Sequence, residues 1–195
     1  SFNNLKPITH VNALKNDYTI VTCDSLKAGV EGYSYVSLSQ GSDNILNEYL
    51  SHKSTAQLQT ISRDLYMNGL EKGSHYIWIY MRRNTSCSIS YKTKIGENFE
   101  LGLGGLNTVI HPNATIGNFV KIAQQVTVGF NGGKEGAKGP IIGNNVYIAP
   151  GSMCLGGKIG DNVIIGANST VLTDIPSNSV VAGTPAKIIS SDISK

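Results

Sequence analysis

The side chains of this sequence that exchange a proton near neutral pH are its four histidines, because the ordinary pKa of an imidazole lies closest to 7. They are His10, His52, His75 and His111. His75 falls in an apolar stretch, SHYIWIY, where we expect a surface or helix-packing role. Only His111, in VIHPNATIG, falls in the regularly repeating part of the chain, so it is the first candidate for proton transfer.

The cysteines and the glycine-rich loop lack the patterns of familiar metal or nucleotide sites. Cys23, Cys87 and Cys154 are odd in number, widely spaced and without a CxxC pair, so they predict neither a disulfide framework nor a zinc knuckle. The loop GGKEGAKG carries Lys134 and Lys138 but lacks the GK[ST] ending with which a P-loop holds magnesium. We therefore expect no metal site, and the cysteine usage points to a reducing, cytoplasmic location.

The composition predicts a folded protein that binds neither nucleic acid nor the membrane interior. With 195 residues, 40% of them hydrophobic, the chain is long enough for one large domain with a sizeable core. Only 15% of the residues are charged and the net charge is +3, which disfavours nucleic acid as a partner. No run of about 18 apolar residues predicts a membrane span, and the N-terminal stretch does not read as a signal peptide.

From Ile110 onward the sequence repeats with a period of six residues. One position in each unit is always apolar, and we call it the frame position. Its occupants are Ile110, Ile116, Ile122, Val128, Ile142, Ile148, Cys154, Ile159, Ile165 and Val171. The next position is mostly glycine or alanine, and the fifth position is mostly small or branched. Upstream, Ile89, Ile95 and Leu101 extend the frame.

A six-residue period fits neither an α-helix nor a simple alternating strand. We interpret each unit as a short strand followed by a turn, with three units completing one triangular coil of a parallel β-helix. Frame residues then point inwards and stack on their counterparts one coil away, which makes Cys154 a core residue rather than a nucleophile. An ordinary glycine-rich antiparallel sheet protein is the alternative that this regularity disfavours.

Three irregularities interrupt the repeat. A small insertion is expected around residues 103–108. A second insertion, FNGGKEGAKGPI, separates Val128 from Ile142, and a one-residue shortening before Ile159 predicts a tightened corner. Insertions in such a fold leave as loops on its side, often near the binding face.

Residues 1–86 lack the repeat and predict a largely helical region, followed by the β-helix over residues 87–189 and a tail over 190–195. Apolar residues at helical spacing predict a helix from Asp43 to Leu70 and a second over Ser74–Arg83. Their apolar faces would cover the open end of the coil stack. The stretches YTIVTC and YSYVSLS fit short strands or irregular structure.

The repeat, with QQVTVG and IGANSTVLTDIPSNSVVAGTPAKII, resembles the hexapeptide-repeat acyltransferases, specifically the serine O-acetyltransferase branch and its polysaccharide O-acetyltransferase relatives. The resemblance covers roughly residues 87–189. It implies a left-handed parallel β-helix, a hand that comes from the family alone, since general connection rules favour the opposite one. It also implies a homotrimer or a dimer of trimers, with acetyl-CoA bound along the groove between neighbouring prisms.

In this family a histidine acts as general base on the acceptor hydroxyl, which then attacks the thioester. Here the corresponding position holds Leu103, or Gly104 if the insertion is placed earlier, and Ser88 stands where relatives carry the accompanying carboxylate. Two expected catalytic groups are therefore missing. His111 is then either a structural corner residue or a base that acts from a neighbouring corner facing the intersubunit groove.

The resemblance assigns the remaining landmarks to acetyl-CoA. Gly129 ends QQVTVG, where the family's backbone runs beside the pantetheine arm. Small residues on the next coils are expected to line the same groove: Ala149, Gly151, Ala167 and Asn168. Three lysines are candidates for the phosphates and the nucleotide: Lys134, Lys138 and Lys187. A structural reading stays open for each, since crowded corners need small side chains in any case and a loop lysine is often only solvated.

The resemblance therefore implies an acetyl-CoA-dependent O-acetyltransferase that acts, without a metal, on serine or on a hydroxyl of a sugar or polysaccharide. No readable motif identifies the acceptor. The alternative suggested by Leu103 is a catalytically silent homologue that serves as a trimeric scaffold or partner-binding subunit. A γ-class carbonic anhydrase shares the prism but needs three histidines on zinc, whereas the repeat holds only His111.

Overall fold

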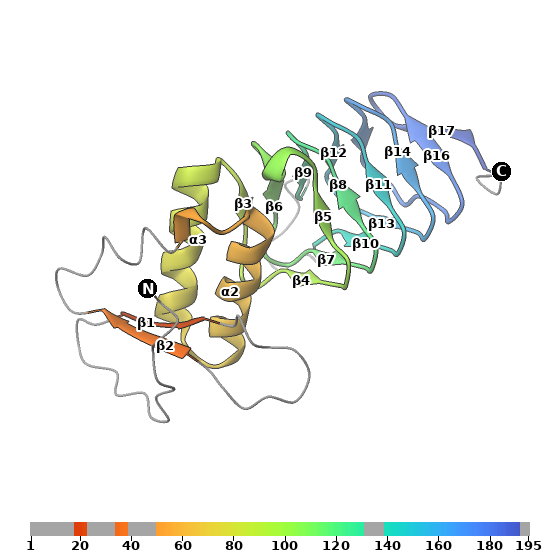
Figure 1. The fold of residues 1–195 in the computed structure, drawn as a ribbon. Coiled ribbons are helices and arrows are strands. Elements are labelled where there is room, and N and C mark those ends of the chain that lie inside the picture. Colours follow the sequence, from red (N-terminus) through yellow and green to blue (C-terminus); the bar gives the residue numbers. More distant parts are fainter. Residues whose placement is uncertain (1–17, 23–33, 39–49, 131–138, 192–195) are drawn as a thin grey trace.

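A computed structural model describes residues 18–22, 34–38, 50–130 and 139–191 of the chain. From residue 88 onward it is a parallel β-helix of stacked coils, and two α-helices cover the first coil (Figure 1). Among the residues that the structure describes, no helix is both long enough and apolar enough to cross a membrane.

The β-helix has three faces, each a ladder of short strands from successive coils. Face I consists of β3 (Ser88–Ile89), β6 (Val109–Ile110), β9 (Thr127–Val128), β12 (Met153–Cys154) and β15 (Thr170–Val171). Face II consists of β4 (Lys94–Ile95), β7 (Thr115–Ile116), β10 (Ile141–Ile142) and β13 (Lys158–Ile159). Face III consists of β5 (Glu100–Leu101), β8 (Lys121–Ile122), β11 (Tyr147–Ile148), β14 (Ile164–Ile165), β16 (Val180–Ala182) and β17 (Lys187–Ser190). The chain visits the faces in the order I, II, III, and only β17 runs antiparallel to its neighbour in these ladders.

The frame position lies inside this prism, as the sequence predicts. All ten frame residues from Ile110 to Val171 are at most 2% exposed. On face III, Ile122, Ile148 and Ile165 stand in register along the stack. The fifth-position residues are also buried: Ala114, Val120, Val126, Val146, Ser152, Val163, Ser169 and Ile175. Two inward positions per unit therefore fill one continuous core.

Glycine is required at the corner between faces II and III because successive coils touch there. The column consists of Gly96, Gly117, Gly143 and Gly160. A Cβ atom on Gly117 would lie 2.5 Å from the carbonyl oxygen of Gly143, closer than any real Cβ contact. The adjoining residues tie the coils together, since Asn118 N donates to Asn144 Oδ1 at 2.9 Å and Asn144 N donates to Asp161 Oδ1 at 2.6 Å.

Two of the three predicted irregularities are confirmed. Between β5 and β6 the chain forms a short 3-10 helix, η2 (Gly102–Gly105), where the first insertion was expected. Between β12 and β13 the corner is short and passes through Gly157, whose φ is +79°. Most of the second insertion, residues 131–138, lies outside the described residues.

The helix α2 (Thr55–Met67) begins later than the sequence suggested. The Ser54 side chain accepts a hydrogen bond from Gln57 N, and the Gln57 side chain accepts one from Ser54 N. Such a capping box starts a helix at the residue after the serine. The prediction of one continuous helix from Asp43 is therefore wrong, and residues 43–49 lie outside the described residues.

The helix α3 (Glu71–Thr85) is longer at both ends than the predicted Ser74–Arg83. Leu65 of α2 and Met81 of α3 belong to the same hydrophobic cluster as Ile89 of the first coil. The helices therefore cover the open end of the stack, as expected (Figure 1). Because this cluster crosses residue 87, the division into domains at that residue stays a prediction.

The two segments left open by the sequence, YTIVTC and YSYVSLS, contain strands. β1 (Tyr18–Thr22) and β2 (Ser34–Leu38) form an antiparallel pair. In Figure 1 this pair lies beside the helices, at the end of the molecule away from the last coils.

Candidate active site

Six of the nine residues predicted for the site fall on two different corners of the prism. On the corner between faces III and I, after β11 and β14, stand Ala149, Gly151, Ala167 and Asn168. On the corner between faces I and II, after β6 and β9, stand His111 and Gly129. Face I separates these two corners, so a single chain does not bring the two sets together.

The III–I corner also contains the position at which the relatives' base was expected. Leu103, in η2, has a left-handed φ of 47° and is 75% exposed. Thr55 Oγ1 at the start of α2 donates a hydrogen bond to Gly104 O, which ties η2 to the helical part. None of the described residues on this corner is titratable: they are residues 102–108, 123–126, 149–152 and 166–169. The III–I corner therefore supplies no general base of its own.

Gly151 and Asn168 have structural reasons for their residue types. Their φ angles are +73° and +55°, a left-handed conformation that glycine and asparagine tolerate best. Gly151 N donates to Gln124 O at 3.2 Å and Asn168 N donates to Pro150 O at 2.9 Å, so each holds its coil to the preceding one. Contact with acetyl-CoA stays a prediction for both, as it does for the two alanines of this corner.

His111 is held on the I–II corner by its backbone and by its ring. Its N–H donates to Val128 O at 2.8 Å, next to Gly129 in the following coil. Its Nδ1 accepts a hydrogen bond from Asn113 N at 3.1 Å. The imidazole stacks on the ring of Phe130, with centroids 6.0 Å apart and planes inclined by 26°. The half-buried ring is therefore oriented before any substrate arrives.

The contact with Asn113 decides which nitrogen of His111 is available. Because Nδ1 accepts a hydrogen bond, the proton of the neutral imidazole resides on Nε2. In that state Nε2 donates to a nearby oxygen and does not accept a hydroxyl proton. A general-base role therefore requires the bond from Asn113 to break, whereas a hydrogen-bond-donor role requires no rearrangement.

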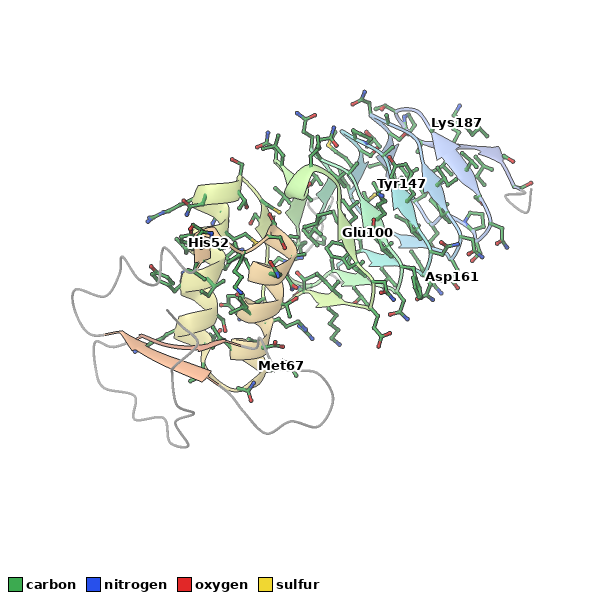
Figure 2. All side chains as sticks on the ribbon, in the orientation of Figure 1. His52, Met67, Glu100, Tyr147, Asp161 and Lys187 are labelled. Atoms are coloured by element: carbon green, nitrogen blue, oxygen red, sulfur yellow. The ribbon has the colours of Figure 1, made fainter. Side chains whose placement is uncertain are left out.

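Of the three candidate lysines, only Lys187 lies in the described part of the chain. Lys187 is exposed on β17, and Figure 2 shows it at the end of the molecule opposite His52. Lys134 and Lys138 lie outside the described residues. In the part of the chain that the structure describes, no three His, Cys, Asp or Glu side chains are grouped to hold a metal ion.

Two residues that shape this site were not singled out from the sequence. One of them is Phe130, whose ring stacks on His111. Its place directly after QQVTVG, beside the expected acetyl-CoA groove, was the signal that could have identified it. Thr55 gave no such signal, because its bond to Gly104 depends on where α2 docks.

Sequence comparison relates the chain to serine acetyltransferases. No family model matches it. A serine acetyltransferase of Staphylococcus epidermidis is 41% identical over 130 residues, which cover 66% of this chain and 61% of the relative. One from Staphylococcus aureus is 44% identical over 109 residues, which cover 55% of this chain and 51% of the relative. The chain therefore matches little more than half the length of these relatives.

Comparison of structures gives the same answer. The serine acetyltransferase of Neisseria gonorrhoeae matches with a TM-score of 0.68 and 29% identity, covering 72% of this chain and 54% of that one. The resemblance to the serine O-acetyltransferase branch is confirmed. The left-handed parallel β-helix with N-terminal helices, expected for a chain like a serine acetyltransferase, is confirmed with it.

Two further structures of serine acetyltransferases carry ligands. The enzyme of Brucella abortus, solved in complex with coenzyme A, matches with a TM-score of 0.66 and 27% identity, covering 70% of this chain and 55% of that one. The Neisseria gonorrhoeae enzyme has also been solved in complex with serine, and that structure matches with a TM-score of 0.65. These ligands are known for the relatives.

Proposed function

We propose that the chain is an acetyl-CoA-dependent O-acetyltransferase and that serine is its acceptor. The observation that carries the proposal is the identity of 41% to a serine acetyltransferase, together with the shared β-helix. The relatives solved with coenzyme A and with serine support this donor and this acceptor over a sugar hydroxyl. No metal takes part, and the cytoplasm is the proposed location.

The division of the predicted site between two corners supports a site shared by two copies of the chain. A donor lying along the III–I corner of one copy, past Ala149 and Ala167, meets His111 and Gly129 only if a second copy presents its I–II corner. Large apolar side chains are exposed on different sides of the prism. Leu103 lies on the III–I corner, whereas Phe119 and Tyr147 lie at or beside face III. Unlike surfaces that bind each other form a closed ring when the rotation closes, so a homotrimer, or a dimer of trimers, fits best.

In the proposed reaction the acceptor hydroxyl loses its proton to a base while its oxygen bonds to the thioester carbonyl carbon. The carbon–sulfur bond then breaks, and coenzyme A leaves as the thiol after taking up a proton. Backbone N–H groups at the corners are suited to hold the oxyanion that forms in between. We assign the base to His111 of the copy that presents its I–II corner, with the ring turned away from Asn113.

The alternative of a silent scaffold rests on the III–I corner, where Leu103 stands and no described side chain titrates. The relatives, all named as enzymes, do not favour it. A scaffold would release no thiol from acetyl-CoA with any hydroxyl acceptor, so the same assay separates the two functions.

The test combines donor binding with thiol release. Calorimetric titration with coenzyme A should show saturable binding well below millimolar concentrations. Thiol release from acetyl-CoA should then depend on serine, and it should be compared with homoserine and with sugar acceptors. His111→Ala is the informative variant, and His52→Ala, an exposed histidine at the helical end, is its matched control. Release that requires a sugar would reassign the acceptor, and coenzyme A binding no tighter than millimolar would reject the function.

A further inference from the structure

A cavity of about 340 Å³ lies where α2 meets the first coil of the β-helix. One face of α2 forms one wall with Gln59, Thr60, Arg63 and Asp64. The turn between β4 and β5 forms the opposite wall. None of these residues belongs to the predicted acetyl-CoA site, so the cavity is independent of the proposed function.

Gln59 lines this cavity and carries an unpartnered donor among the described residues. The residue is only 5% exposed, yet its Nε2 is buried without a hydrogen-bond partner. A buried amide group that leaves water without a replacement partner is costly, and native proteins keep few of them. Gln59 also lines the cavity, so a turn of its side chain toward that space would let a ligand atom serve as the missing acceptor.

Arg63 brings a fixed positive charge to the same wall. Its Nη1 donates to Tyr91 O at 3.2 Å and to Thr93 O at 3.0 Å, so the guanidinium is held in place by two neutral carbonyl groups. No carboxylate of the described residues forms an ion pair with it. An arginine has five N–H donors in a rigid fork that matches a carboxylate. Among the described residues only Nη1 of Arg63 is engaged, so its Nε and Nη2 donors are offered to a ligand.

We propose that this cavity binds the carboxylate group of a small organic ligand. The amide of Gln59 and the guanidinium of Arg63 supply donors and a positive charge, and the cavity has room for a small molecule. Asp64 lines the same space and already has a partner of its own. The negative charge of Asp64 repels a doubly charged phosphate more strongly than a singly charged carboxylate. The cavity should therefore prefer the carboxylate.

The test uses the full chain and three probes: acetate, propionate and inorganic phosphate, each at matched ionic strength. Acetate or propionate, both singly charged, should raise the unfolding temperature saturably, since a ligand that binds only the folded state stabilises it. The same titration should shift the side-chain amide NMR signals of Gln59. Phosphate should bind more weakly than both carboxylates, and tighter binding of phosphate would overturn the choice of carboxylate.

Variants separate this site from general charge effects. Gln59→Leu keeps the size of the side chain and removes its donor, so the ligand-free protein should keep its stability while carboxylate affinity falls about tenfold. Arg63→Lys should weaken binding similarly because the fork is lost, whereas Arg83→Lys, an exposed arginine at the end of α3, should change nothing.

If no probe shifts the Gln59 signals, or if Gln59→Leu binds carboxylates as wild type does, the cavity holds only water and the proposal fails. Thiol release with serine is measured separately, so either proposal can fail alone.

Discussion

The backbone N–H of Asn113 donates a hydrogen bond to Nδ1 of His111 at 3.1 Å, and this contact fixes the tautomer of the one histidine in the β-helix. It leaves Nε2–H as the group that the ring presents. His111 can therefore act in two chemically distinct ways. As a base its ring must first turn away from Asn113, whereas as a hydrogen-bond donor through Nε2–H it needs no rearrangement.

Substitution of His111 distinguishes these two ways of acting. His111→Ala should lower kcat/KM about 100-fold or more if the imidazole transfers the proton. His111→Gln keeps an N–H near the place of Nε2, so it should restore activity for a donor and remain as inactive as alanine for a base. The measurement is steady-state thiol release over a range of pH. Activity of His111→Ala equal to that of the His52→Ala control would remove His111 from the mechanism.

Gly129→Ala tests whether the donor passes close to the I–II corner. Among the described residues, a Cβ atom at Gly129 would meet only Thr127 Cγ2 at 3.4 Å and Leu155 Cδ2 at 3.6 Å, which are ordinary contacts. The substitution should therefore leave the free energy of unfolding within about 0.5 kcal/mol of wild type. It should raise the KM for acetyl-CoA about tenfold if the pantetheine arm lies there. An unchanged KM would show that the arm runs elsewhere.

Gly117→Ala provides the opposite case on the II–III corner. Its Cβ would lie 2.5 Å from the carbonyl oxygen of Gly143, and two stacked backbones must separate to admit it. We expect a loss of about 1–3 kcal/mol in the free energy of unfolding, measured by urea denaturation. A variant as stable as wild type would mean that the coils are less closely stacked than described.

Burial of the Cys154 thiol predicts a dependence of stability on alkaline pH. Burial raises the pKa of Cys154 from an ordinary 9.0 to about 12. Below about pH 9 the thiol is protonated in both states, but above it the unfolded thiol ionises first, so stability falls as pH rises. Between these two pKa values the loss should approach roughly 1.4 kcal/mol per pH unit for this thiol.

The matched variant is Cys154→Val, because Val128 and Val171 flank this position in the same column. Urea denaturation at a mildly and a more strongly alkaline pH should show a flatter loss of stability for the variant than for wild type. Equal slopes would mean that Cys154 contributes nothing to the pH dependence. Wild-type Cys154 should also resist thiol reagents until the protein unfolds.

The start of α2 depends on Ser54. Ser54→Ala removes the side chain that accepts from Gln57 N, so it should lower the free energy of unfolding by about 1 kcal/mol, measured by urea denaturation. Ser54→Asp retains an acceptor at the cap and should remain close to wild type. Equal stability of the alanine variant would show that tertiary packing alone fixes the helix start.

The core of the β-helix was predictable residue by residue because the six-residue period of apolar residues indicates a strand and a turn in each unit, with the apolar residue inside the coil. Every frame residue from Ile110 to Val171 proved to be buried. The start of α2 was missed although the signal was present, since Ser54 and Gln57 have the spacing of a capping box. The helix was predicted to start at Asp43 because apolar residues at helical spacing continue upstream of Ser54.

The residues of the candidate site stay predictions, and their geometry was only partly readable from the sequence. Counting repeat units places His111 at the end of face I and Ala149 at the end of face III, so the separation of the two corners was readable in principle. The orientation of the His111 ring and the cavity beside Gln59 were not readable. They depend on a turn within three residues and on the docking of α2 against the first coil.

The most direct test of the proposed function is mass spectrometric detection of the product formed from acetyl-CoA and serine. We expect O-acetylserine in equal amount to the coenzyme A released, and loss of both with His111→Ala but not with His52→Ala. Absence of any acetylated product, with serine or with sugars, from a folded chain that also fails to bind coenzyme A would contradict it.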